Sequence, residues 1–430
     1  MKKIKLTFIS IAVLFTIEIS AQSGKLQIGA EFRPRLLIDN GYGTPQLKGE
    51  STPLYVTQRT RLNAGFQQDK VESYISLQDV RLWGEDNNYK SSGVYGNTES
   101  LSLHQGWVKL NLNKMLSLKI GRQLFAYDDQ RIVSARNWND YQVTYDALLA
   151  EFKTSKHRLH IGLSYNAESK SNILFPETKF KSFDFIHYQY KIEKLTLSGI
   201  AVVTENTVSD STENFILRGT YGTNLNYKNK KFNSHISAYY QHNLNDEGGK
   251  VSSICLSAFI YYDLVQKLNL GIGLDYLSGN DETSSSTVDN KFDILYGRRH
   301  GWYGYMDYFS TTPEQGLQDY MAKLTYNPSD KLDIQLHYHY FLLSSNKYDE
   351  TNPVEKINKN LGHEIDLKLK WELQKSVNLE CGYSIYSMTN TLKQLKKVMG
   401  QELKTPQYCY VAITVKPSVL FDLPDKTTVN

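Results

Sequence analysis

The 430-residue sequence has no long hydrophobic run after its first 21 residues, and its mean hydropathy is −0.47. A membrane-spanning helix needs about 20 consecutive apolar residues, so a helical membrane protein is excluded. Cysteine is scarce as well. Cys255, Cys381 and Cys409 are an odd number, which excludes a complete disulfide framework.

An excess of one charge is also missing. Lys and Arg number 49 against 45 Asp and Glu, a net charge of +4, and the charges are dispersed along the chain. We therefore expect no nucleic-acid partner. His104, His300 and His363 lack a serine and an acidic residue at a recognisable catalytic spacing, so we expect neither an enzyme nor a cofactor. A lipid hydrolase or acyltransferase is the alternative.

The sequence does contain several segments in which apolar and polar residues alternate. Over residues 268–276, leucine, isoleucine and tyrosine occupy every second position, and Asn, Gly and Asp occupy the positions between them. Residues 158–165, 332–340 and 364–371 repeat the pattern. A strand of this kind shows opposite chemistry on its two faces. Soluble β-sandwiches alternate too, so the connections must decide the class.

The connections are alternately short and long. Compact turns are expected at 68–70, 113–115, 154–156, 228–230 and 327–330. Long polar loops are expected at 40–53, 84–99, 125–142, 166–181, 278–315, 343–360 and 389–406. This asymmetry is typical of bacterial outer-membrane barrels. We predict an all-β fold, a single-chain transmembrane antiparallel barrel of about 18 strands with both termini in the periplasm.

The N-terminal segment fits that location. Residues 1–21 have a basic start, an apolar stretch and small residues before a cleavage point, which is typical of a secretory signal peptide. An uncleaved anchor helix is the alternative. We expect the barrel over residues 22–416, with its last strand at 407–415, and a periplasmic tail over residues 417–430. The expected location is the outer membrane of a Gram-negative bacterium. We expect the three cysteines to face lipid, with a contact between Cys381 and Cys409 as the alternative.

Arginines recur on the polar face of the first strands. Arg33 and Arg35 share a face with Glu31, and Arg59 and Arg61 share the corresponding face of the next strand. A parity slip after residue 77 suggests a bulge that would bring Asp79 and Arg81 to the same side. An arginine facing lipid at mid-bilayer costs about 2–4 kcal/mol, so these side chains are expected in the lumen. Clustered guanidiniums favour anions, carboxylates in particular. The alternative is an internal salt-bridge network with Glu31, Asp79 and Asp129.

Several motifs together resemble the alginate export family of outer-membrane porins. They are EFRPR at 31–35, QRTRL at 58–62, QDVRLWG at 78–84, LHQG at 103–106, IGRQ at 120–123, YDDQRI at 127–132, NW at 137–138, YDA at 145–147, DYLSGND at 275–281, HGWYGYMD at 300–307 and GHEIDL at 362–367. The resemblance implies an eighteen-stranded monomeric barrel that passes a polyuronate through an arginine-lined lumen. The implied lining is Arg33, Arg35, Arg59, Arg61, Arg81, Arg122 and Arg131, with Asp79 and Asp129 as partners. Strict alternation would turn Arg122 outward unless a bulge or the strand end intervenes.

The expected function is therefore passage of an anionic polysaccharide, an alginate-like polyuronate, in the export direction. The alternative is a general or small-anion porin, which a loop at residues 125–142 folded into the lumen would favour. The expected partners are that solute and outer-membrane lipid, and we expect no resident metal. Calcium at residues 280–282 with Asp289, or at Asp128 and Asp129, is the alternative, although the spacing fits no EF-hand.

Overall fold

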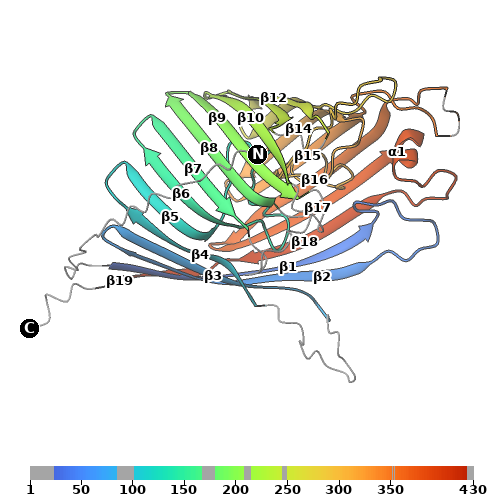
Figure 1. The fold of residues 1–430 in the computed structure, drawn as a ribbon. Helices are drawn as coiled ribbons and strands as arrows, with labels where there is room; N and C mark the ends of the chain where they lie inside the picture. The colour runs from blue at the N-terminus through green and yellow to red at the C-terminus, as the bar shows by residue number, and fades with distance from the viewer. Residues whose placement is uncertain are drawn as a thin grey trace, which may run out of the picture.

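The computed structural model describes residues 24–84, 101–166, 180–207, 215–244, 249–350, 352 and 354–423. They form a closed antiparallel β-barrel of 18 strands, which confirms the predicted fold class (Figure 1). The expected signal peptide lies outside the described residues. No helix within the described residues is long and apolar enough to cross a membrane.

In chain order the strands are β1 (Gly24–Asn40), β2 (Leu54–Gln68), β3 (Val71–Leu82), β4 (Ser102–Asn111), β5 (Leu116–Gln123), β6 (Tyr145–Lys153), β7 (His157–Tyr165), β8 (Phe180–Ile192), β9 (Leu195–Thr207), β10 (Phe215–Lys228), β11 (Phe232–Asn243), β12 (Ser252–Val265), β13 (Leu268–Leu277), β14 (Leu317–Ser329), β15 (Leu332–Leu342), β16 (Asn360–Gln374), β17 (Val377–Met388), β18 (Gln407–Val415) and β19 (Ser418–Leu423). A short helix, α1 (Asn390–Leu395), lies between β17 and β18.

From β1 to β18, each strand pairs with the next one along the chain. The segments β18 and β19 follow one another along the same edge, and both pair with β1, which closes the barrel. Short turns such as residues 69–70, 193–194 and 375–376 join alternate pairs of strands, and long connections join the others. In Figure 1 the short turns and the described end of β19 lie at one end of the barrel, opposite the long loops around α1. The alternation of short turns and long loops that the sequence predicts is therefore present.

The last strand is longer than expected. β18 ends at Val415, as the sequence suggested, but Ser418–Leu423 then forms β19 and pairs with Gly24–Gly29 of β1. Pro417 lies between the two segments and cannot donate a backbone hydrogen bond, which separates them. The part of the expected tail that the structure describes therefore extends the barrel wall.

The two faces of the wall follow the alternation. In β12, Ile254, Leu256 and Ile260 are exposed on the outside, whereas Cys255, Ser257 and Phe259 are buried inside. The outer face of a membrane barrel contacts the hydrocarbon of the bilayer, which solvates these apolar side chains favourably. Cys381 and Cys409 lie on the outward parity, but the expectation for Cys255 was wrong. It points inward and is 1% exposed, because it shares its parity with Ser253 and Ser257 rather than with the apolar residues.

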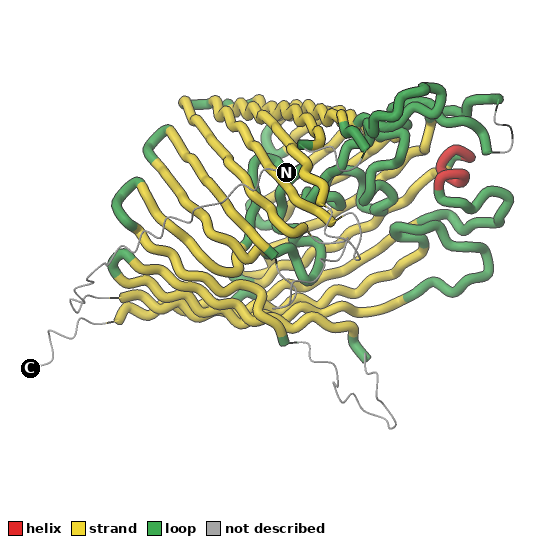
Figure 2. Tube along the Cα trace, viewed as in Figure 1, coloured by secondary structure: helices red, strands yellow, loops and turns green. Residues whose placement is uncertain are grey.

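Two long connections fold back into the barrel. Residues 124–144, between β5 and β6, and residues 278–316, between β13 and β14, appear in Figure 2 as loop segments within the wall. They meet where Val133 pairs with Tyr296, and the amide of Ser134 donates to the Tyr296 carbonyl at 3.1 Å. Phe125, Ile132 and Phe292 pack with wall residues into a buried apolar core. The barrel is therefore partly filled by its own loops.

The face assignment predicts unequal effects for neighbouring substitutions. Leu62 is 61% exposed on the outer face at the middle of β2, whereas Asn63 points inward and borders a cavity of about 220 Å³ that Glu31 also lines. Leu62→Arg should lower the free energy of unfolding by about 2–4 kcal/mol, because a lipid-facing guanidinium is poorly solvated. Asn63→Arg should cost about 1 kcal/mol, for the lost hydrogen bond from Tyr74. Denaturant titration in lipid vesicles measures both, and equal losses would contradict the assignment.

Candidate functional site

Four of the expected lumen arginines form one cluster. Arg33 and Arg35 on β1 and Arg59 and Arg61 on β2 point into the barrel, and the register places Arg33 opposite Arg59. Residues that face each other across antiparallel strands lie about 4.5–5.5 Å apart, so the guanidiniums are neighbours. All four side chains are buried. The inner parity read from the sequence thus places them together.

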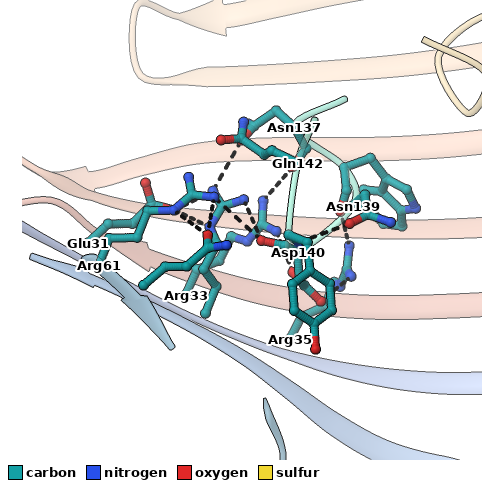
Figure 3. Close-up of polar contacts among 12 residues, drawn as sticks. Glu31, Arg33, Arg35, Arg61, Asn137, Asn139, Asp140 and Gln142 are labelled. Atoms are coloured by element: carbon teal, nitrogen blue, oxygen red, sulfur yellow. Dashed lines mark hydrogen bonds and ion pairs between the residues drawn. The ribbon is translucent and has the colours of Figure 1, made fainter. Parts of the chain in front are cut away.

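The loop between β5 and β6 covers this cluster. Figure 3 shows residues Asn137, Asn139, Asp140 and Gln142 of that loop beside Arg33 and Arg35. The Asp140 carboxylate pairs with Arg33 through one oxygen and with Arg35 through the other, at 2.9 Å for Arg35. Backbone carbonyls accept further hydrogen bonds, from Arg33 to Asn137 at 2.8 Å and from Arg35 to Trp138 at 3.1 Å. The loop is therefore fastened across the arginines.

The wall supplies the remaining partners. Arg59 donates to Glu31 at 2.8 Å, and Arg61 donates to the Gln78 amide oxygen at 2.9 Å. Within the described residues, three of the four guanidiniums form ion pairs, Arg33 and Arg35 with Asp140 and Arg59 with Glu31. Burial raises the pKa of Asp140, but Arg35 and Arg33 outweigh it, so the pKa lies below its usual value. The cluster keeps an excess of positive charge.

Asp129 and Arg131 lie elsewhere inside the barrel. Asp129 forms a hydrogen bond with His235 on β11 at 2.9 Å, and Arg131 pairs with Asp275 on β13 at 2.7 Å and with Asp129 at 2.7 Å. Burial lowers the pKa of Arg131, but the two carboxylates outweigh it and raise the value. The Arg131 guanidinium also stacks over Trp302 at 4.1 Å. These buried contacts fasten the loop to the opposite wall rather than leaving the arginine open to a solute.

Three expected lumen residues face outward instead. The register shift lies on β4 at His104, so β3 continues without a bulge, and Asp79 and Arg81 stay on the outer parity with Ile75. Arg81 donates to Asp79 at 2.7 Å and also borders the cavity described next. Arg122 keeps strict alternation and pairs with Asp146 at 2.7 Å on the outside. All three lie at strand ends, where an outward charge costs only about 0–1 kcal/mol.

A cavity of about 440 Å³ lies beside the cluster. Its charged lining includes five arginines against two aspartates: Arg35, Arg81, Arg136, Arg298, Arg299, Asp140 and Asp307. The arginines outnumber the carboxylates on its surface. The charged side chains that line this cavity therefore carry a net positive charge.

Three of these arginines, Arg136, Arg298 and Arg299, were missed by the sequence analysis. Arg136 donates to the carbonyls of Gly297 at 3.0 Å and Leu295 at 2.8 Å, and Arg299 donates to Leu295 at 3.1 Å. Within the described ranges, none of the three forms an ion pair with a carboxylate. Burial and the nearby Arg299 lower the pKa of Arg136 to about 10. Strand parity says nothing about loop residues, so only the Arg298-Arg299 pair in the sequence gave any signal.

The acidic residues considered for calcium are held by donors of the protein. Asp128 accepts from His187 at 2.9 Å and from Ser198 at 2.6 Å, and Asp281 accepts from Asn346 at 2.8 Å and from Thr283. Hydrogen bonds from Thr283 are the first cause of the lowered pKa of Asp281. The contacts explain these carboxylates without an ion, so they add nothing to the calcium alternative.

Comparison with known proteins gives a family and a fold. The model of the alginate export family matches residues 25–165 and 259–404. Among solved structures, OprD from Pseudomonas aeruginosa is 13% identical with a TM-score of 0.62, covering 92% of this chain and 94% of that one. The BenF-like porin from Pseudomonas fluorescens Pf-5 is 13% identical with a TM-score of 0.60, covering 92% and 99%. OpdK from Pseudomonas aeruginosa, solved with vanillate, is 11% identical with a TM-score of 0.58, covering 92% and 99%.

No curated protein matches the sequence significantly. The solved porins are too distant in sequence to show more than the fold, but that fold and the family match agree on an outer-membrane channel of a Gram-negative bacterium. The chain belongs to the alginate export family.

Proposed function

We propose that this channel passes an anionic polysaccharide, an alginate-like polyuronate, out of the periplasm as a monomer and without catalysis. The observation that carries the proposal is the cavity lined by Arg136, Arg298 and Arg299, whose guanidiniums lack carboxylate partners within the described residues. Each uronate unit of such a polymer carries one carboxylate. A planar guanidinium fork binds that group through two parallel hydrogen bonds.

Repeated weak sites suit transport better than one tight site. A polymer must enter the site and leave it again, so binding has to be favourable at several positions and strong at none. Arg136, Arg298 and Arg299 offer successive positions along the cavity that they line. The exposed side chain of Arg298 and the half-buried Arg299 lie next to each other in the chain, so a carboxylate can exchange partners over a short distance.

A small-anion porin is the second candidate, and one observation favours it. The loop at residues 124–144 does fold into the barrel, where it narrows the lumen. OpdK, a structural neighbour of this chain, was solved with vanillate, which is a small carboxylate. The same arginines would attract such a solute, so the two candidates differ in the size of the anion rather than in its charge.

Conductance in planar lipid bilayers tests the proposal. We expect an anion-selective pore that alginate blocks, whereas neutral dextran does not, because only the uronate carboxylates engage the arginines. Joint substitution of Arg136, Arg298 and Arg299 by Gln should raise the half-blocking alginate concentration about tenfold or more, since one charged hydrogen bond contributes about 1.5 kcal/mol or more.

Arg122→Gln is the matched control, because that arginine lies on the outer wall. A cation-selective pore that ignores alginate would refute both candidates. Block by monomeric glucuronate at the same uronate concentration as alginate would select the small-anion porin, because a polymer that occupies several sites gains from their linkage.

The fastening of the inner loop gives another prediction. Asp140→Asn removes the carboxylate that two buried guanidiniums share, so it should cost about 3–5 kcal/mol of unfolding free energy and increase the conductance of channels that remain folded. Asp146→Asn breaks an exposed pair on the outer wall and should cost less than about 1 kcal/mol. Urea titration and single-channel recording measure the two effects, and unchanged conductance in Asp140→Asn would argue against the loop as a constriction.

A further inference from the structure

Away from the arginines, two histidines and an aspartate gather on the inner wall. His337 and His339 lie two residues apart on β15 and therefore share its inner face. Asp366 on β16 lies directly opposite His337 in the register. All three side chains are buried, and one ligand atom from each lies within 4.8 Å of the others. None of them belongs to the transport site described above.

The hydrogen bonds of His339 leave one of its ring nitrogens available. Nδ1 lies 3.0 and 2.8 Å from the two oxygens of Asp319 on β14, and a carboxylate acceptor at both distances assigns the proton to Nδ1. Nε2 then carries a lone pair, and it lies 3.7 Å from an Asp366 oxygen. A carboxylate that holds one nitrogen of a histidine while the other nitrogen binds metal is a recurring arrangement in metalloproteins.

The other two residues lack partners. Both oxygens of Asp366 and Nδ1 of His337 are buried without a hydrogen bond within the described part of the chain. An ionised carboxylate buried in this way is costly unless a cation or proton compensates it. Lys368, two residues along β16, pairs instead with Glu380 at 3.1 Å. Lys323 faces His337 from β14, and its ammonium lies over the rings of Phe259 and Trp302 at 5.0 and 5.4 Å.

We propose that His337, His339 and Asp366 bind a divalent transition-metal ion of the zinc class, with Asp319 as a positioning residue. Two imidazole nitrogens and one carboxylate oxygen suit such an ion and do not suit magnesium or calcium, which prefer oxygen ligands.

An ion at this place would join the wall to the inner loop. Tyr305, from the connection between β13 and β14, lies over the site with its ring 5.5 Å from that of His337. The Glu364 carboxylate accepts from the amide of Met306 in the same connection at 2.8 Å. Metal binding would therefore stabilise β14, β15, β16 and the loop they hold, because binding to the folded state alone lowers the free energy of that state.

Metal content of the purified full-length protein tests the proposal. The protein is unfolded in chelator, refolded in detergent with or without Zn²⁺, and assayed for bound zinc by mass spectrometry. We expect about one ion per folded chain and a higher melting temperature with zinc. His339→Gln and Asp366→Asn should each weaken binding more than about 100-fold, and Asp319→Asn by about 10- to 100-fold.

His187→Gln is the matched control, because His187 is also buried on the inner face and binds Asp128 outside this cluster. Zinc binding that persists in Asp366→Asn, or a wild-type protein that binds no more zinc than His337→Gln/His339→Gln, would overturn the proposal. If the variants fail to fold, Co²⁺ replaces Zn²⁺ in the wild-type protein. Visible ligand-field bands of a nitrogen-ligated ion support the site, and their absence overturns it.

Discussion

Hydrocarbon outside the barrel neither solvates a charge nor accepts a backbone hydrogen bond, and the rest of the structure depends on this constraint. Every strand must pair, so the chain closes into a barrel, and charges at mid-membrane must face inward. Arg33, Arg35, Arg59 and Arg61 are gathered on one stretch of wall for this reason. Four neighbouring arginines repel one another unless acidic partners compensate their charge. The loop at residues 124–144 supplies one such partner, Asp140, from inside the barrel.

This arrangement divides the arginines into two groups. The four on β1 and β2 are buried and largely engaged by Glu31, Gln78 and Asp140, as an internal network requires. Arg136, Arg298 and Arg299, which lie on the inner loops, border open space. The internal network therefore accounts for the first group, and the proposed anion site uses the second. The first group holds the loop, and the loop carries part of the second group.

Periodicity was sufficient to predict strands, turns and the inward arginines of β1 and β2. Side chains alternate between the two faces of a strand with a fixed period, and lipid requires the outward face to be apolar. The prediction failed at strand ends and in loops, where alternation and contact with lipid no longer determine the direction of a side chain. Arg81 and Arg122 lie at strand ends, where lipid no longer penalises a charge, and the bulge was placed on β3 although it lies on β4. Arg136, Arg299 and Asp140 lie in loops, whose course depends on tertiary contacts that no local pattern contains. Cys255 shows that an apolar residue also fits the inner face where loops fill the barrel.

Loops that carry a transport site are ordinarily mobile, but these two are fixed at several points. Val133 pairs with Tyr296 between them, Asp129 binds His235 on the wall, and Met306 donates to Glu364 near the histidine cluster. Trp138 stacks on His300 at 3.9 Å, and His300 stacks on Tyr305 at 4.8 Å, so aromatic contacts connect the arginine cluster with that side of the wall. Large loop displacement would break buried ion pairs, whereas rotation of a long arginine side chain would not. Under the proposed function, a rigid backbone with movable guanidiniums would let carboxylates pass from one arginine to the next without opening the barrel.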